Sequence, residues 1–164
     1  AQTQPGGEGA ADALVERREE GYRRWVAKHS LEVIDGELFA ERMMLKWKCR
    51  PTIHFVMPVQ RGEEALLADT IDSLSAQLYQ EWGLTVIADF ASPDPAFEQL
   101  PNLQWIAIDD GETPAAAADR AITAAGADWV VLVHPGVRAA PHLTIRCSDY
   151  IDACLLYTSP SPRD

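Results

Sequence analysis

The sequence predicts an α/β fold with a doubly wound, mostly parallel sheet, preceded by an N-terminal helical segment. From residue 52 to residue 133, short apolar stretches alternate with helical stretches four times. Such alternation is typical of parallel strands joined by right-handed crossovers. The apolar stretches are nearly continuous, as expected where helices cover both faces of a sheet. The 164 residues suffice for one domain with a hydrophobic core.

Two helices are expected before the sheet. The first, over residues 13–29, sets apolar side chains among arginines and glutamates. The second, over residues 36–48, carries three apolar residues at a spacing of four, namely Phe39, Met43 and Trp47. This spacing places the three side chains on one face. The pair Arg50-Pro51 ends the second helix, because the residue before a proline avoids the helical region.

Proline, glycine and aspartate mark the ends of the elements in the sheet-forming segment. Strands are expected over residues 52–57, 84–88, 103–108 and 129–133. Helices are expected over residues 63–78, 96–100 and 114–125, and another begins after residue 141. Asp89 and the pair Asp109-Asp110 follow the second and third strands. Pro114 suits the first turn of its helix, and Gly126 suits its end.

These boundaries predict a domain organisation. Residues 1–12, rich in glycine, alanine and glutamine, are expected to be disordered, and residues 13–50 form a helical extension. Residues 51–153 form the α/β domain. Residues 154–164, C-L-L-Y-T-S-P-S-P-R-D, resemble a translated sequencing adapter, so that the natural protein would continue past residue 153. The alternative is a native tail rich in serine and proline.

Composition and charge exclude several classes of function. The net charge of −11 argues against a nucleic-acid binder, which needs a basic surface, and against binding of anionic lipid by charge alone. No apolar run approaches the ~20 residues of a membrane span. The three cysteines are scattered and form no C-x-x-C pair, so no zinc site is predicted. A reducing, cytoplasmic location is the simplest interpretation.

Four motifs occur in a specific order along the chain. They are Y-R-R-W from Tyr22, R-P-T-I-H-F-V-M-P-V from Arg50, I-D-S-L-S-A-Q-L-Y from Ile71 and A-D-F-A-S from Ala88. This ordered set resembles the bacterial family 2 glycosyltransferases with the GT-A fold. The resemblance covers residues 22–143 and implies that residues 51–153 are the nucleotide-sugar-binding half of a truncated GT-A domain.

The resemblance implies a reaction and its partners. A UDP- or dTDP-sugar would be the donor, and a cell-surface polysaccharide or a lipid-linked molecule would accept the sugar. Members of the family usually use Mg²⁺ or Mn²⁺. A cytoplasmic protein peripheral to the inner membrane is implied, with a second glycosyltransferase domain in a longer chain. The catalytic base would lie beyond residue 153, so no catalytic residue is assigned and this fragment is expected to be inactive.

The motifs place six candidate residues for binding the nucleotide sugar. They are Pro58, Val59, Gln60, Arg61, Asp89 and His134. Asp89 matches the first acid of the family's D-D-x-S motif, and Phe90 replaces the second. Arg61 is a candidate to pair with the diphosphate, and an exposed loop arginine is the alternative. His134 is a candidate phosphate donor, and a plain histidine at a strand end is the alternative.

The segment after the fourth strand decides between two functions. Residues 134–137, H-P-G-V, stand where the family has the acids of its D-x-D-D motif, and they supply no carboxylate. Because Mg²⁺ and Mn²⁺ prefer oxygen ligands, no metal site is predicted. One hypothesis is a glycosyltransferase that does not depend on metal. The other is a non-catalytic scaffold or docking domain of the same fold, and whether the chain is an enzyme stays open.

Overall fold

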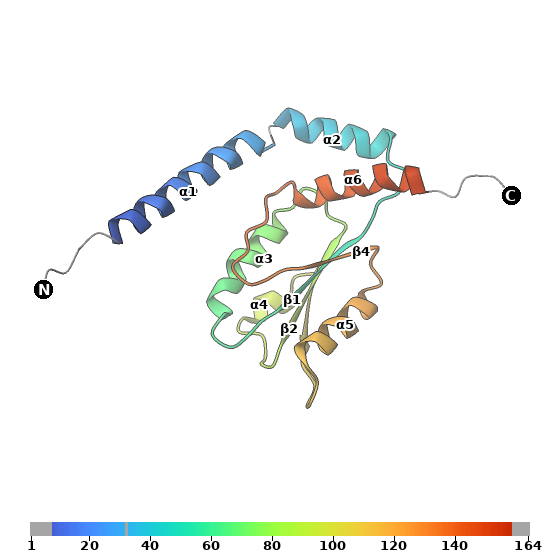
Figure 1. Cartoon of the computed structure of the whole chain (residues 1–164). Coiled ribbons are helices and arrows are strands. Elements are labelled where there is room, and N and C mark those ends of the chain that lie inside the picture. The colour runs from blue at the N-terminus through green and yellow to red at the C-terminus, as the bar shows by residue number, and fades with distance from the viewer. Residues whose placement is uncertain (1–7, 32, 159–164) are drawn as a thin grey trace, which may run out of the picture. The chain divides into compact units, whose positions relative to one another are not determined.

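The computed structural model describes residues 8–31 and 33–158, and Figure 1 shows the arrangement of its elements. The chain divides into two compact units, residues 1–37 and 38–164. Helix α1 (Glu8–His29) belongs to the first unit, and α2 (Val33–Leu45) begins in the first unit and ends in the second. No described helix is long and apolar enough to cross a membrane.

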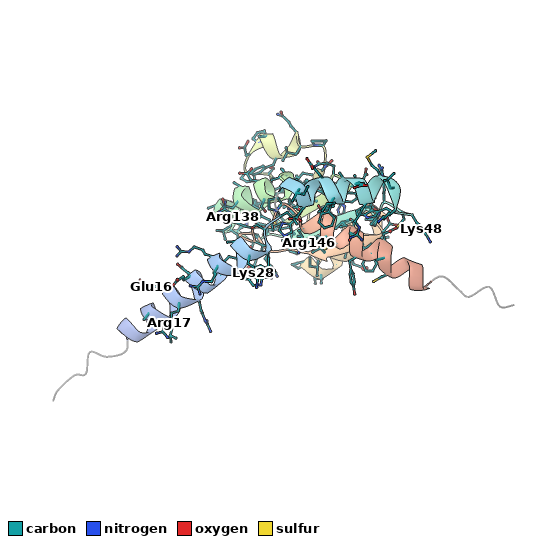
Figure 2. All side chains as sticks on the ribbon, turned by 90° about the horizontal axis from the view of Figure 1, so that it is seen from above. Glu16, Arg17, Lys28, Lys48, Arg138 and Arg146 are labelled. Carbon is teal, nitrogen blue, oxygen red and sulfur yellow. The ribbon has the colours of Figure 1, made fainter. Side chains whose placement is uncertain are left out.

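Helix α1 begins earlier than the sequence predicts. Residues 8–12, expected to be disordered, are helical, and residues 1–7 lie outside the described residues. The alanines at positions 10, 11 and 13 have the highest helix propensity of any residue and explain the earlier start. Charged side chains such as Glu16 and Arg17 project from the helix (Figure 2). Pairs of Arg and Glu four residues apart lie within 3.3 Å of each other along it.

The described residues form a four-stranded parallel sheet, which confirms the predicted fold class. Its strands are β1 (Ile53–Pro58), β2 (Trp82–Ala88), β3 (Leu103–Ala107) and β4 (Trp129–Leu132). Their order is β3-β2-β1-β4, and every neighbouring pair is parallel. Ile53 is in register with Trp82 on one side and with Trp129 on the other, so the strands begin at one level.

Helices cover both faces of this sheet. Between the strands lie a 3₁₀ turn η1 (Glu64–Leu66) and helices α3 (Leu67–Ser75), α4 (Pro95–Glu98) and α5 (Pro114–Ala125), and α6 (Leu143–Thr158) follows β4. On one face Phe55 and Met57 pack in a core with Leu67 and Leu74 of α3. On the opposite face Val56 and Ile87 pack with alanines 117 and 121 of α5. The alternation of side chains along β1 therefore supplies both cores.

Two helices end earlier than predicted because acceptors far along the chain bind the backbone N–H groups that follow them. Helix α2 ends at Leu45 rather than at residue 48, since the N–H groups of Lys48 and Cys49 donate to Asp152 at 2.8 and 3.1 Å. Helix α3 ends at Ser75 rather than at residue 78, since the Leu78 N–H donates to the Pro141 carbonyl at 2.9 Å. In both places a tertiary contact overrides local propensity.

Two helix starts also differ from the prediction: α2 begins at Val33 rather than at residue 36, and α3 begins at Leu67, after the turn η1, rather than at residue 63. The remaining boundaries agree closely with the sequence. Helix α5 occupies residues 114–125 as predicted, with the Thr113 hydroxyl accepting the Ala116 N–H at 3.2 Å and Gly126 at φ +57°. These are the usual chemical signals for a helix start and end. Helix α6 continues through residue 154 to residue 158, and the rest of the predicted adapter tail, residues 159–164, lies outside the described residues. The adapter origin of that tail stays a prediction.

Candidate ligand crevice at the carboxyl edge of the sheet

The strand order places a topological switch point between β1 and β4. From β1 the chain continues to β2 and β3 on one side of the sheet, and it then crosses to β4 on the other side of β1. In open α/β sheets, ligands bind beyond the carboxyl ends of the strands at such a switch point. The Val59 N–H donates to the Ile87 carbonyl at 2.8 Å, and the Val133 N–H donates to the Val56 carbonyl at 3.0 Å. The loops after β1, β2 and β4 therefore start at one level, and the six predicted site residues share this edge.

Three of the loops at this edge contain the same four-residue turn. They are residues 60–63 after β1, 109–112 after β3 and 134–137 after β4. In each, the fourth N–H donates to the first carbonyl, at 3.1, 2.9 and 3.2 Å respectively. The third residue is glycine at φ +95°, +82° and +86°. A positive φ at the third position defines a type II turn and explains the glycines.

Glutamates close two of these turns. The Glu63 carboxylate accepts the Gln60 N–H at 2.9 Å, and the Glu112 carboxylate accepts the Asp109 N–H at 3.0 Å. The Glu64 carboxylate likewise accepts the Gly62 N–H at 2.7 Å. The backbone donors of the β1 loop are thus occupied by the loop's own acids and do not point freely at an anion. The signal that sequence analysis missed is the repeated Gly-Glu pair, R-G-E and D-G-E.

Arg61 and Asp89 meet across the ends of β1 and β2. The Arg61 guanidinium donates to the Asp89 carbonyl at 2.9 Å and lies 3.4 Å from its carboxylate. The same guanidinium lies 5.6 Å from the centre of the Phe90 ring, which packs edge-on against Trp105. The Trp105 indole N–H donates to the Phe90 carbonyl at 3.0 Å. The two charged side chains are 67% and 58% exposed, so both stay accessible to a ligand.

The other predicted residues of the β1 loop contribute mainly through the backbone. Val59 is 4% exposed and packs in the core, so a ligand could reach its main chain but not its side chain. Pro58 is half-buried at the end of β1, and Gln60 is exposed. The ligand roles of Pro58, Val59 and Gln60 stay predictions.

The turn after β4 is fixed to helix α3 through its backbone. The Gly136 N–H donates to the Thr70 hydroxyl at 2.9 Å, and the Ala139 N–H donates to the Ser73 hydroxyl at 3.0 Å. The His134 side chain is exposed, and it forms no hydrogen bond to any residue that the structure describes. A rigid turn therefore presents the imidazole to solvent at the switch point. Its proposed contact with phosphate stays a prediction.

Substituting Gly136 is expected to strain this turn. Its φ of +86° is disfavoured for a residue with a Cβ, although the nearest atoms, those of Leu66, lie 3.6 Å or more from an added Cβ. Gly136→Ala should therefore lower the free energy of unfolding by about 1–2 kcal/mol, measured by urea denaturation. Gly36→Ala is the control, since Gly36 lies inside α2 with open space around it and alanine favours helix. Equal stability of the Gly136 variant and the wild type would contradict the strain argument.

Polar residues on α3 and just after its end hold the whole segment after β4. Besides Thr70 and Ser73 of α3, they include Gln77, which follows the helix and is 2% exposed. Its amide nitrogen donates to the Ala140 carbonyl at 2.8 Å, and its amide oxygen accepts the N–H and the hydroxyl of Thr144 at 3.0 and 3.1 Å. Gln77 therefore joins α3 to the start of α6 and fixes the path of the crevice loop between them.

Tyr79 completes the same motif. It is 3% exposed, its hydroxyl donates to the Pro51 carbonyl at 3.0 Å, and its ring packs edge-on against Trp47. Burial is the main reason that its pKa is raised to about 12. The Q-L-Y motif that carries much of the family resemblance thus has a structural explanation in this chain.

The acids of this edge are engaged by other groups of the protein. Among the described residues, no group of three or more His, Cys, Asp or Glu side chains could hold a metal ion. Residues 134–137 offer no carboxylate, and the Asp89 carboxylate is paired with Arg61. Mg²⁺ is usually held by one or two carboxylates together with phosphates and waters, and residues 134–137 do not supply them. The absence of a metal site stays a prediction.

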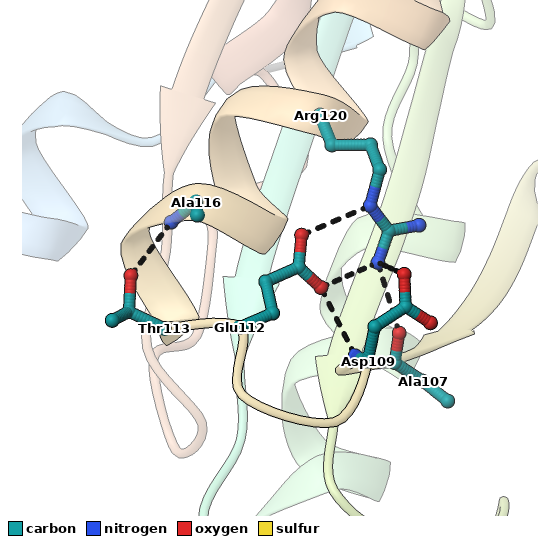
Figure 3. Close-up of polar contacts among 6 residues, drawn as sticks. All are labelled: Ala107, Asp109, Glu112, Thr113, Ala116 and Arg120. Carbon is teal, nitrogen blue, oxygen red and sulfur yellow. Dashed lines mark hydrogen bonds and ion pairs between the residues drawn. The ribbon is translucent and has the colours of Figure 1, made fainter.

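Asp109, which could be taken for part of a displaced metal pair, belongs to a structural ion-pair cluster. Arg120 of α5 lies 3.5 Å from Asp109, forms two hydrogen bonds to the Glu112 carboxylate at 3.1 and 2.7 Å, and donates to the Ala107 carbonyl at 3.1 Å (Figure 3). The Arg120 hydrogen bond is the main reason that the pKa of Glu112 is lowered. The cluster ties the end of β3 to α5, and the turn interpretation of Asp109 is favoured.

Comparison with known proteins identifies the fold. No protein-family model matches the chain, and no curated protein matches it. The structure of S. aureus TarS 1–349 superposes with a TM-score of 0.53 at 18% identity, covering 62% of this chain and 32% of TarS. The structure of TarS 1–349 in complex with UDP superposes with a TM-score of 0.52 at 17% identity, covering 62% of this chain and 32% of TarS. A mannosyltransferase from Pyrobaculum calidifontis, solved with GDP-Man and Mn²⁺, gives only 0.47 at 16% identity, with 78% and 40% coverage.

The chain shares its parallel α/β fold with TarS over 62% of its length.

The match has a defined extent. At these identities the likeness shows the fold alone, and this chain spans about a third of the length of TarS 1–349.

Proposed function

We propose that this chain is the nucleotide-sugar-binding half of a bacterial family 2 glycosyltransferase domain. One observation carries the proposal: the loops after β1, β2 and β4 meet beyond the switch point of a parallel sheet in the order β3-β2-β1-β4. The fold shared with TarS, which was solved in complex with UDP, supports a UDP- or dTDP-sugar as the ligand. A cell-surface polysaccharide or a lipid-linked acceptor follows from the motif resemblance.

Arg61 is the group best placed to meet the diphosphate. Its guanidinium has five N–H donors, and Asp89 engages two of its nitrogens, one of them over a long 3.4 Å contact. An incoming phosphate can therefore bind the Arg61 guanidinium beside the Asp89 carboxylate or in its place. Asp89, released from the ion pair, can accept a ribose hydroxyl. His134 supplies a further N–H from the opposite side of the crevice, so that binding needs no metal ion.

The second candidate function is a non-catalytic docking domain of the same fold. A specific observation favours it: Phe90, which stands in place of an acid, packs against Trp105, and Glu63 and Glu64 already occupy the donors of the β1 loop. These carboxylates add negative charge near the site that a diphosphate would occupy. On this hypothesis the crevice keeps its architecture and binds donor weakly or not at all.

Calorimetric titration of the 164-residue chain tests the proposal. UDP-glucose and dTDP-glucose are titrated with Mn²⁺ and with EDTA, and binding of equal affinity in the two conditions is expected. Arg61→Ala should weaken binding about tenfold, the effect of losing a charge-assisted hydrogen bond. Arg17→Ala, an exposed arginine of α1, is the matched control and should bind as the wild type does.

Three outcomes separate the hypotheses. Binding enhanced by Mn²⁺ would contradict the loss of the metal site. Absence of any binding would overturn the proposed function and leave the docking domain. Release of UDP from the donor, measured on the same samples, would favour the glycosyltransferase, whereas its absence is expected of this fragment on both hypotheses.

A further inference from the structure

The Arg61 guanidinium lies over an aromatic ring at the end of β2. Its central carbon is 5.6 Å from the centre of the Phe90 ring. A guanidinium within about 6 Å of a ring centre is attracted to the face of the ring, because the π electrons make that face negative. The ring carries no formal charge, yet it attracts the group that is best placed to meet a diphosphate.

Trp105 of β3 holds the Phe90 ring in place. The two rings pack edge-on, with their centres 5.8 Å apart and an angle of 67° between their planes. The Trp105 indole N–H also donates to the Phe90 carbonyl at 3.0 Å. Trp105 is in register with Val86 of β2, and both aromatic side chains pack against the core on the α3 face. The ring under Arg61 is therefore held by the sheet and not by the β1 loop.

The Asp89 carbonyl is a second anchor for the guanidinium. It accepts an Arg61 N–H at 2.9 Å, whereas the Asp89 carboxylate makes only a long contact of 3.4 Å. The Arg61 side chain is 67% exposed, and a free side chain of this length would lose much conformational entropy when a ligand ordered it. A guanidinium that already rests on a ring and a carbonyl loses less, so these two contacts prepare it for an anion.

A ring suits this position better than an acid would. The resemblance to the family 2 enzymes places an acid where Phe90 stands. Carboxylates of Glu63, Glu64 and Asp89 already lie on the loops after β1 and β2. A fourth carboxylate would neutralise Arg61 further and repel a diphosphate. The Phe90 ring attracts the guanidinium without adding a negative charge, and so it leaves the charge of Arg61 available to a ligand.

We propose that Phe90 is a positioning residue for donor binding, which holds the Arg61 guanidinium where its charge can meet the diphosphate. Trp105 acts through Phe90 by fixing the ring. The change from an acid to phenylalanine then exchanges a nucleoside contact for a prepared diphosphate contact. This inference rests on the proposed function, because it assigns Phe90 a part in binding the nucleotide sugar.

The mobility of the Arg61 side chain tests the positioning without any ligand. The order parameter of its Nε–H group, measured by NMR relaxation on the 164-residue chain, reports motion on the picosecond to nanosecond scale. Phe90→Leu keeps an apolar side chain and removes the ring, so it should lower this order parameter. Phe90→Tyr keeps the ring and should leave it unchanged. An equal order parameter in the wild type and in Phe90→Leu would overturn the proposal.

Calorimetric titration with UDP-glucose tests the effect on the donor. Phe90→Leu should weaken binding about two- to fivefold, the range of a cation–π contact at an exposed site, and Phe90→Tyr should retain the wild-type affinity. In the Arg61→Ala background, Phe90→Leu should cause no further loss, because the group that it positions is absent. Phe97→Leu is the matched control, since Phe97 of α4 packs against the same core, and it should bind as the wild type does.

The outcomes distinguish this inference from the proposed function. If the wild type binds UDP-glucose and Phe90→Leu binds it equally well, the inference is overturned and the proposed function stands. A loss of the same size in the Arg61→Ala background would also overturn the inference, because Phe90 would then act through the packing of the core. A wild-type chain that is folded by circular dichroism and binds no UDP-glucose would overturn the proposed function, and with it the part of Phe90 in donor binding.

Discussion

Gln77→Ala is expected to lower the free energy of unfolding by about 2–4 kcal/mol. The substitution leaves the Thr144 N–H without a partner inside the protein, and an unsatisfied buried group costs about 1–3 kcal/mol. It also removes one hydrogen bond to the Ala140 carbonyl, worth about 1 kcal/mol, although that carbonyl still accepts the Leu143 N–H at 2.9 Å. Gln77 is 2% exposed and Thr144 is fully buried, so water does not readily replace the amide. Urea denaturation followed by tryptophan fluorescence measures the loss.

Two further variants identify the cause. Gln104→Ala removes the same side chain from an exposed position of β3 and should change stability by no more than about 0.5 kcal/mol. Gln77→Glu keeps the size and replaces the amide donor by a carboxylate facing the carbonyls of Ser73 and Ala140. It should destabilise about as much as Gln77→Ala at neutral pH. A Gln77→Ala variant no less stable than Gln104→Ala would contradict the argument.

Gln77 affects the proposed site because it fixes the segment after β4 next to α3. The segment from Gly136 to Thr144 is fixed to α3 by Thr70, Ser73 and Gln77, and it carries the turn that presents His134. Loosening this segment should weaken nucleotide-sugar binding even in conditions where the sheet stays folded. The hydrogen bonds of Gln77 and Tyr79 thus make the Q-L-Y motif a structural support of the proposed site.

The sheet could be predicted because each strand carries its own signal. Apolar runs of four to seven residues, each ended by proline, aspartate or histidine, predicted the boundaries of all four strands to within two residues. Pro114 and Gly126 predicted both ends of α5. Their alternation with helices predicted parallel pairing, because a crossover helix joins parallel strands. These are local patterns, and the fold follows from them.

The arrangement of the site was predictable in part. Arg61 was expected in the loop after the first strand and Asp89 at the end of the second, and the structure brings them into contact. Their mutual ion pair was not foreseen, because it depends on which way two long loops turn. The closure of the β1 loop by Glu63 was missed as well, although its Gly-Glu pair is visible in the sequence. Glu63 was expected to begin a helix, whereas it closes the turn before it.

Long-range polar contacts were beyond the reach of the sequence. The end of α2 at Leu45 depends on Asp152, which lies more than a hundred residues away along the chain. Helical periodicity alone extends α2 to residue 48, because nothing nearby signals that Lys48 and Cys49 donate elsewhere. The same contact gives the second large expected effect of a substitution.

Asp152→Ala is expected to cost about 2–4 kcal/mol in the free energy of unfolding. Asp152 is 6% exposed, and one of its oxygens accepts the N–H groups of Lys48 and Cys49 at 2.8 and 3.1 Å. A hydrogen bond to a charged group contributes about 1.5–3 kcal/mol, and losing both leaves two backbone donors unpaired. Asp110→Ala, at an exposed turn residue, is the control and should change stability by about 0.5 kcal/mol or less.

The pH dependence of stability distinguishes charge from packing at this position. Burial raises the pKa of Asp152, but the hydrogen bonds from the N–H groups of Cys49 and Lys48, with the Cys49 thiol and the Lys48 charge, together outweigh burial and leave the pKa below its ordinary value. A lowered pKa in the folded state means that the ionised carboxylate stabilises the fold above the unfolded pKa of about 3.9. That stability is lost as the pH falls from there through the folded pKa.

Asp152→Asn isolates this charge, because its amide oxygen can still accept both N–H groups. The difference in unfolding free energy between the wild type and Asp152→Asn should be constant near neutral pH and should shrink as the pH is lowered below about 4. Urea denaturation at a series of pH values measures it. A difference that stays the same down to acid pH would show that geometry alone, without the charge, holds α6 to the segment after α2. A difference that grows on acidification would contradict the lowered pKa of Asp152 itself.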